Sequence, residues 1–127
     1  MSYKSYKSLG IDKNKPSPES MGNVFEISNK IERDSILQQN SIVIIDNYTT
    51  WCNPCNKITP YFAQLAQTYS GKCFLAKEDV DKNILGKPNI LGVPCFHFYI
   101  NGTFIPDMTV TGADIEKVRE TIENIIS

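Results

Sequence analysis

The sequence predicts a single α/β domain in which a central mixed β-sheet is flanked by helices. Three observations support this fold class. The chain has 127 residues, enough to bury one hydrophobic core without staples. Its first part alternates β-branched runs with amphipathic segments, which is typical of parallel βαβ units. Asn101-Gly102 lies between two later apolar runs and predicts a tight hairpin, which adds antiparallel pairing.

The first 22 residues differ in character from the rest of the chain. They are rich in Ser, Lys, Pro and Asn and show no hydrophobic period. We expect a flexible N-terminal extension over 1–22 and one folded domain over 23–127. Two interpretations of the extension stay open, a targeting or docking tail and a solvated terminus.

The domain begins with a predicted strand, a helix and a second strand. Residues 24–27 form a short apolar run, and Asn29 with Glu32 has the spacing of a capping box. A helix over 29–39 should follow, with three apolar residues facing the core: Ile31, Ile36 and Leu37. The run "SIVIID" has almost no polar alternation, which favours a central strand buried on both faces.

A second helix and strand come next. Residues 54–71 predict a helix that ends at Gly71. Its apolar residues recur at helical spacing: Ile58, Phe62, Leu65, Ala66 and Tyr69. A strand over 72–80 and a turn-rich connection over 81–92 should follow it.

The last third predicts a hairpin and a closing helix. The apolar strand after Pro94 should run to residue 100 and turn at Asn101-Gly102 into a strand near 104–110. The final segment predicts an amphipathic helix with five residues toward the core: Ile115, Val118, Ile122, Ile125 and Ile126.

Composition and charge exclude several classes of protein. The chain is 41% apolar and 21% charged with a net charge of -1, and its charges are interspersed, so no nucleic-acid surface is expected. The apolar runs are far shorter than the roughly 20 residues of a membrane helix. The start of the chain lacks the apolar region of a secretory signal, so we expect a cytoplasmic location. Thiols are kept reduced there, and the four cysteines then favour metal binding or catalysis over stapling.

The segment "TTWCNPCNKITPYF", residues 49–62, carries the strongest chemical signal. Cys52 falls where the buried strand gives way to a helix, so its sulfur should lie near the positive end of the helix dipole. That position favours the thiolate, which can attack a disulfide. Cys55 lies nearly one turn further on and can resolve the mixed intermediate. Pro54 suits the first turn, where a missing N–H costs nothing.

Several motifs resemble those of a thioredoxin in order and spacing: "DNYTTWCNPC", "KITPYF", "AKEDVD", "GVPCFHFY", "NG" and "TGA". The resemblance covers residues 24–127 and is specific, because W-C-x-P-C is joined by an Asp six residues earlier and a later Val-Pro. It implies the thioredoxin fold. It also implies a protein-disulfide reductase, a thiol–disulfide oxidoreductase that works through a reversible Cys52–Cys55 dithiol/disulfide.

The resemblance implies roles for individual residues. Cys52 would be the nucleophile and Cys55 the resolving thiol. Asp46 corresponds to the buried carboxylate of the family that accepts the proton of the resolving cysteine, and Lys77 to the lysine near it. A carboxylate in an apolar strand should have its pKa raised toward a useful value.

A substrate-docking surface is implied as well. Val93-Pro94 resembles the cis-proline loop of the family, whose backbone binds an extended substrate chain. Trp51, Gly92 and Gly112 resemble the rest of the apolar surface around the reactive sulfur. The implied partners are protein disulfides and a thioredoxin reductase-type or glutathione-based reductant. No bound cofactor, metal, nucleic acid or membrane is expected.

The sequence departs from the family at several positions. Asn53 replaces the usual Gly, and Asn53-Pro54 is the dipeptide that tunes the redox potential. Asn47 and Tyr48 stand where Phe and Trp are usual, and a buried Asn needs a partner. Cys95 replaces a common Thr and would place a third sulfur close to the pair, in either a structural or a redox role. The connection over 81–94 is short, so the helix of the family there should shrink to a turn.

Alternatives remain for both the cysteines and the function. A metal site would need further ligands, with Cys73, Cys95 and His97 as candidates, although no second closely spaced pair is present. Cys73 and His97 are also typical of buried core positions. The alternative functions are a protein disulfide oxidase or isomerase, and a thioredoxin-fold binding module without turnover.

Overall fold

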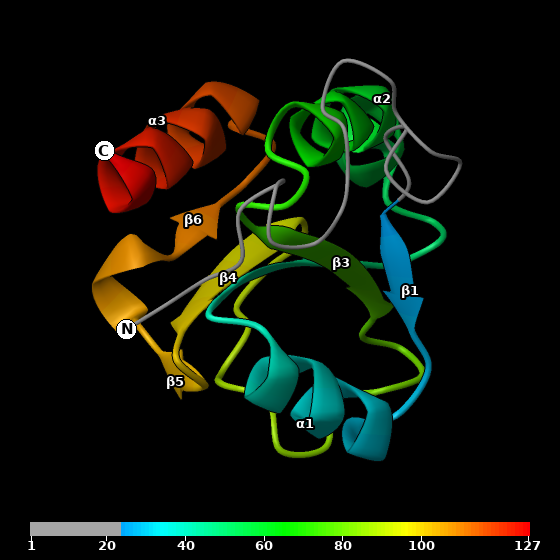
Figure 1. Cartoon of the computed structure of the whole chain (residues 1–127). Coiled ribbons are helices and arrows are strands. Elements are labelled where there is room, and N and C mark those ends of the chain that lie inside the picture. The colour runs from blue at the N-terminus through cyan, green and yellow to red at the C-terminus, as the bar shows by residue number, and fades with distance from the viewer. Residues whose placement is uncertain (1–23) are drawn as a thin grey trace.

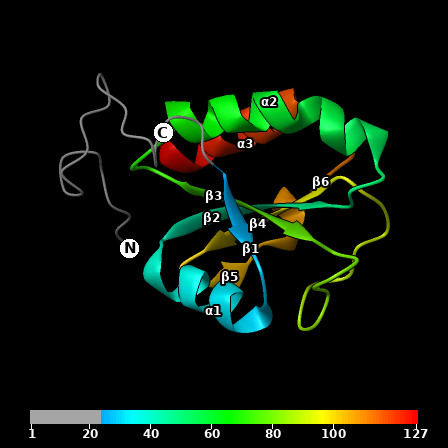
Figure 2. The same ribbon diagram turned by 90° about the vertical axis from the view of Figure 1, so that its right-hand side faces the viewer.

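The computed structural model describes residues 24–127, and the extension expected over 1–22 lies outside the described residues. A mixed sheet lies between α1 on one face and α2 with α3 on the other (Figures 1 and 2). The elements in chain order are β1 Phe25–Ile27, α1 Lys30–Gln39, β2 Ile42–Tyr48, α2 Asn53–Thr68, β3 Phe74–Asp79, β4 Cys95–Ile100, β5 Thr103–Phe104, the 3₁₀ turn η1 Pro106–Met108, β6 Val110–Thr111 and α3 Ile115–Ile126.

The strand order confirms the expected mixed sheet. The strands lie in the order β1-β3-β2-β4-β5, and β6 also pairs with β4. β3 is parallel to β1 and β2, whereas β4 is antiparallel to β2, β5 and β6. β2 is therefore central, and its carboxyl end leads directly to the two cysteines. In this register Asp46 lies between Lys77 of β3 and Phe96 of β4.

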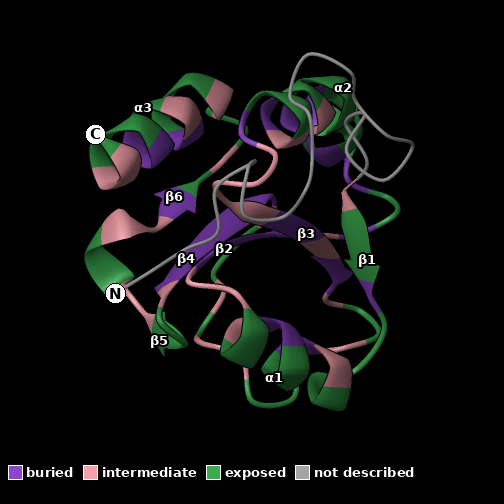
Figure 3. Ribbon diagram, in the orientation of Figure 1, coloured by how far each residue is buried: buried purple, intermediate pink, exposed green. Residues whose placement is uncertain are grey.

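Two apolar layers hold the helices against the sheet. Alternate residues of β2 enter opposite layers because successive side chains of a strand point to opposite faces. The layer under α2 and α3 includes Ile42, Ile44, Phe62, Phe96, Phe98 and Ile122. The layer under α1 includes Ile27, Ile36, Val43, Ile45, Ala76 and Tyr99. Figure 3 shows β2 and β4 buried along most of their length, as expected for central strands.

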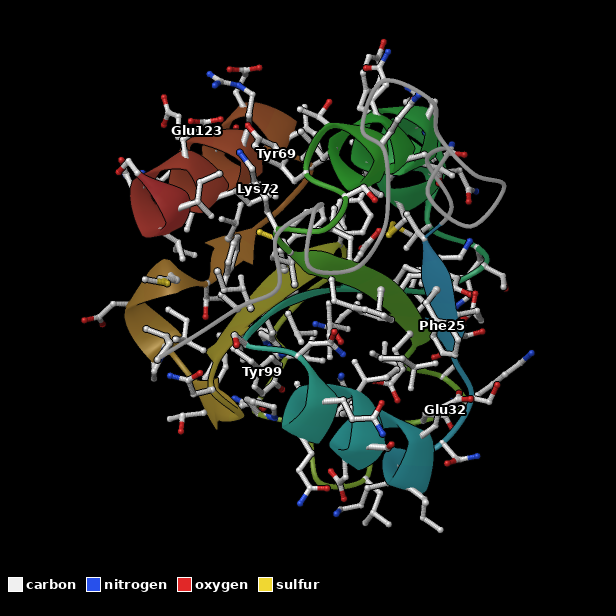
Figure 4. All side chains as sticks on the ribbon, viewed as in Figure 1. Phe25, Glu32, Tyr69, Lys72, Tyr99 and Glu123 are labelled. Carbon is white, nitrogen blue, oxygen red and sulfur yellow. A yellow bond between two sulfur atoms is a disulfide. The ribbon has the colours of Figure 1, made fainter. Side chains whose placement is uncertain are left out.

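The helices begin and pack largely as their sequences predict. The N–H of Glu32 donates to Asn29 Oδ1 at 2.8 Å, and Glu32 Oε1 accepts from the N–H of Ser28 at 2.7 Å, so the capping interaction is present. Val118 and Ile122 of α3 are fully buried. Tyr69, which follows α2, donates a hydrogen bond from its hydroxyl to Glu123 of α3 and joins the two helices (Figure 4).

The prediction that Ile31 faces the core is wrong. Its side chain is 83% exposed, and Arg33 takes the inward position at 2% exposure. Arg33 donates from Nε and Nη2 to the two carboxylate oxygens of Glu78, each at 2.9 Å. A fully buried carboxylate requires such a partner, so the charge pair sets the inner face of α1 in place of the apolar residue.

The hairpin forms where expected, but its second strand is interrupted. Asn101 and Gly102 have φ of 52° and 80°, as a type I′ turn requires. The single strand predicted near 104–110 is wrong, because η1 separates β5 from β6. Pro106 begins η1 and has no N–H to donate to a ladder.

The connection between β3 and β4 contains turns and no helix, in line with the short connection predicted from the sequence. Lys87 anchors it by donating to Glu78 Oε1 at 2.7 Å, and Arg33 donates to the carbonyl of Leu85 at 2.8 Å. Within residues 24–127, no helix is both long enough and apolar enough to cross a membrane.

Candidate active site

The two cysteines lie at the start of α2, directly beyond the carboxyl end of β2. Cys52 is the N-cap of the helix, and a disulfide joins it to Cys55 with 5.2 Å between their Cα atoms. The N–H of Cys55 donates to Cys52 Sγ at 3.1 Å. A sulfur held by a helix N-terminal N–H is stabilised as a thiolate after reduction, because the donor and the dipole both favour negative charge.

Asn53 and Pro54 occupy the first positions of α2 between the cysteines. Both are exposed, whereas Cys52 and Cys55 are buried at 5% and 2% exposure. Pro54 needs no hydrogen-bond acceptor in this turn. The dipeptide therefore forms the exposed surface of this turn, with the two disulfide-bonded cysteines buried on either side of it in the sequence.

Asp46 is a buried acid on the face of the sheet that α2 covers. It is 4% exposed, and its Oδ1 atom has no hydrogen-bond partner among the described residues. Burial raises the pKa of Asp46 to about 7, while Lys77 opposes the increase and Glu26 adds to it. The carboxyl group can therefore take up or release a proton near neutral pH.

Lys77 lies beside Asp46 in the sheet, but its ammonium group is directed to other partners. The two residues are paired across β2 and β3. Lys77 Nζ lies 3.8 Å from Glu26 Oε1 and 5.4 Å from the centre of the Tyr48 ring. The structure thus places the predicted lysine near the acid and adds Glu26, which the sequence did not single out.

Trp51 precedes Cys52 and projects into solvent. Its side chain is 72% exposed, so it is not a core residue. The indole N–H donates to Asp81 Oδ2 at 2.8 Å, which fixes the ring from its polar edge. An exposed ring held in one orientation leaves its apolar face free for contact with another molecule.

The loop before β4 lies against the reactive sulfur. The Val93-Pro94 peptide bond is cis, and the Val93 carbonyl oxygen lies 3.7 Å from Cys52 Sγ. The N–H of Gly112 donates to the Pro94 carbonyl at 2.8 Å. Apart from the adjacent residues in the chain, no described atom lies within 4 Å of where a Cβ on Gly92 or Gly112 would stand, so this surface is open.

Cys95 lies on the other face of the sheet. It is paired with Asn47, whose Nδ2 donates to the Cys95 carbonyl at 2.8 Å and lies 3.1 Å from His97 Nδ1. Asp46 points to the opposite face, because neighbouring strand residues alternate. The sheet therefore separates the Cys95 side chain from the layer beneath α2, contrary to the third sulfur expected beside the pair. The buried Asn47 amide thus has partners for its Nδ2 atom, whereas its Oδ1 atom has none among the described residues.

The remaining metal-ligand candidates are Cys73, which is partly buried, and Cys95 and His97, which are buried. Burial lowers the pKa of His97 to about 4, so the imidazole is neutral, and burial raises the pKa of Cys73 to about 12. Cys73 and Cys95 are free thiols. In the part of the chain that the structure describes, no three His, Cys, Asp or Glu side chains are grouped to hold a metal ion.

Comparison with known proteins identifies the family. A family model described as Thioredoxin matches residues 24–124. The chain belongs to the thioredoxin family. It is 35% identical over 99 residues to Thioredoxin 1 of Plasmodium falciparum, covering 76% of this chain and 92% of the relative. It is also 35% identical over 102 residues to Thioredoxin-1 of Schizosaccharomyces pombe, covering 79% and 96%.

Solved structures agree with this assignment. A structure of Plasmodium falciparum thioredoxin has a TM-score of 0.73 and 35% identity, covering 80% of this chain and 98% of that one. The thioredoxin fold is thus confirmed, and with the Cys52–Cys55 disulfide it makes the chain a thiol–disulfide oxidoreductase of the protein-disulfide reductase class. Membership of the family implies protein disulfide substrates and a reductase partner, and thioredoxins need no bound cofactor.

Proposed function

We propose that Cys52 is the attacking thiol and Cys55 the resolving thiol of this reductase. The Cys52 thiolate attacks one sulfur of a substrate disulfide and expels the other as a thiolate, which leaves a mixed disulfide. Cys55 then attacks the Cys52 sulfur, releases the second substrate thiolate and completes the internal disulfide. Two electrons pass from the dithiol to the substrate. The assignment of Cys52 as the attacking thiol rests on its position, because Cys52 caps α2 and lies beside the Val93 carbonyl oxygen.

Asp46 takes the proton of Cys55 in the resolving step. A base suits this role when its pKa lies near the working pH, which burial gives to Asp46. Cys55 lies inside α2, the helix that covers the face of the sheet on which Asp46 lies, whereas Cys52 is the N-cap that precedes this helix. This difference favours Cys55 over Cys52 as the thiol that Asp46 serves. The positive charge of Lys77 favours the ionised form of Asp46 and so limits the increase in its pKa.

The substrate docks over Trp51, Gly92, Val93, Pro94 and Gly112. The exposed indole and the two uncovered glycines leave room for an extended chain to approach Cys52 closely. Asn53 and Pro54 border the same approach and tune the redox potential of the pair. Substitution of either glycine by a larger residue would reduce the space available to the substrate chain.

Reduction of the internal disulfide must come from outside the chain. A thioredoxin reductase-type or glutathione-based reductant supplies the two electrons, with no cofactor bound to this protein. We place the protein in the cytoplasm, since its two free thiols, Cys73 and Cys95, suit a reducing compartment. Electron transport to protein disulfides is its role there.

Insulin reduction with dithiothreitol as electron donor tests the cysteine roles. Cys52→Ser should lose activity at least 100-fold, because the attacking thiolate is absent. Cys55→Ser should accumulate a mixed disulfide between Cys52 and the substrate, detectable by mass spectrometry. Cys73→Ser is the matched control and should keep full activity. Turnover by Cys52→Ser, or an adduct on Cys73, would contradict the assignment, and wild-type binding without turnover would favour the binding module.

A further inference from the structure

Glu26 ends a row of charged residues that runs across three strands. Asp46 of β2, Lys77 of β3 and Glu26 of β1 are successive partners in the sheet register. Aligned residues on neighbouring strands point to the same face, so all three side chains lie on the face of α2. The row leads from a buried carboxyl at 4% exposure to a Glu26 side chain that is 45% exposed.

The contacts in this row hold the ammonium group of Lys77 at Glu26, the exposed end of the row. Tyr48 donates its hydroxyl to the Glu26 carboxylate, with 2.8 Å to each oxygen, and this fixes the carboxylate beside the sheet. Lys77 Nζ lies 3.8 Å from Glu26 Oε1, and the Tyr48 ring lies beneath the ammonium group at 5.4 Å. Glu26 and Tyr48 thus form the binding site for the ammonium group of Lys77.

We propose that Glu26 is a positioning residue that binds Lys77, weakens the attraction of its ammonium group for the Asp46 carboxylate, and so lets Asp46 hold a proton in the resolving step. The proposal rests on the proposed role of Asp46 as proton acceptor. Glu26 acts in two ways, by its own negative charge and by drawing Lys77 outward. Both make ionisation of Asp46 less favourable.

The other described groups near Asp46 do not supply a free charge that would change its proton affinity as Glu26 and Lys77 do. β3 also contributes Asp79, whose Oδ1 is engaged by the Asp81 N–H, and α2 contributes Cys55, which does not titrate in the disulfide. Burial and Glu26 keep the Tyr48 phenol protonated by raising its pKa. β4 presents the apolar Phe96 on this face, and Cys95 lies on the opposite one. Lys77 and Glu26 are therefore the charges through which the proton affinity of Asp46 is adjusted.

The direct test is a titration of the Asp46 carboxyl by ¹³C NMR in the disulfide form. Glu26→Gln should move the Asp46 midpoint down by about half a pH unit, the size expected for partly exposed charges. Glu116→Gln is the matched control, since it removes a Glu from an exposed pair with Arg119 on α3, and should leave the midpoint in place. An unchanged or higher midpoint in Glu26→Gln would overturn the proposal.

A double variant separates positioning from direct repulsion. With Lys77→Gln in place, the effect of Glu26→Gln should shrink, because no ammonium group is left to be released. An undiminished effect would overturn the role of Glu26 through Lys77. In the reduced protein, Glu26→Gln should shift the pH profile of insulin reduction in the same direction. If Asp46→Asn left that profile unaltered, the proposed function of Asp46 would fail, whereas the disulfide-form titration would still decide the inference.

Discussion

Asp46 is an acid in a position where ionisation costs free energy. Its ordinary pKa of 3.8 rises to about 7 in the folded chain, mainly because burial removes the carboxylate from water. The folded state therefore keeps a proton that the unfolded chain has lost. The contribution of Asp46 to stability therefore falls as the pH rises from about 4 to about 7. Such a destabilising acid is consistent with a functional role, because a fold selected for stability alone would place an apolar residue there.

Asp46→Asn should remove this pH-dependent loss. The difference between 3.8 and about 7 corresponds to about 4 kcal/mol, so the variant should gain up to about that free energy of unfolding at pH 8. Below pH 4 the gain should vanish, since Asp46 is protonated in both states. Urea unfolding at pH 3.5 and pH 8 measures both values. A variant less stable than the parent at pH 8 would show that the buried carboxylate is stabilised by contacts.

At the scale of elements, a buried charge cluster fixes the connection that carries the docking loop. Arg33 of α1 and Lys87 of the connection both bind Glu78 of β3, and the three side chains are at most 3% exposed. The cluster thus links a helix, a strand and the segment that leads to Pro94. Because that segment has no helix of its own, these contacts replace secondary structure in holding it.

Glu78→Gln should destabilise the protein by about 3 to 5 kcal/mol, because two cations would stay buried without their carboxylate. Thermal unfolding measures the loss. Glu116→Gln is again the control and should leave the melting temperature almost unchanged, since its pair is exposed. Equal stability of the Glu78 variant and the parent would show that Arg33 and Lys87 find other partners.

Across the whole molecule, local sequence patterns predicted the helices and strands. Contacts between residues distant in sequence decided which side chains are buried. The unbroken apolar run of β2 and the Asn101-Gly102 turn are local signals, and both were confirmed. The burial of Arg33 in place of Ile31 depends on Glu78, 45 residues away. The available signal for it was an acidic residue that follows Phe74 and Ala76 on the same face of β3.

The site shows the same division. Cys52 and Cys55 could be predicted because their motif is contiguous, and their disulfide is present in the structure. Asp46 and Lys77 came from a resemblance, and the register shows them side by side. Glu26 could not be predicted, since only the pairing of β1 with β3 brings it to Lys77. The place of Cys95 likewise depends on the face to which its strand residue points.

The reduction potential of the Cys52–Cys55 pair decides whether this protein works as a disulfide reductase. Equilibration in glutathione and dithiothreitol buffers, followed by Trp51 fluorescence, gives the midpoint. We predict a value at or below about -250 mV, which suits a cytoplasmic reductase. A value at or above about -180 mV would contradict the reductase account and favour an oxidase or isomerase, and the lack of a reversible transition would contradict a redox role for the pair.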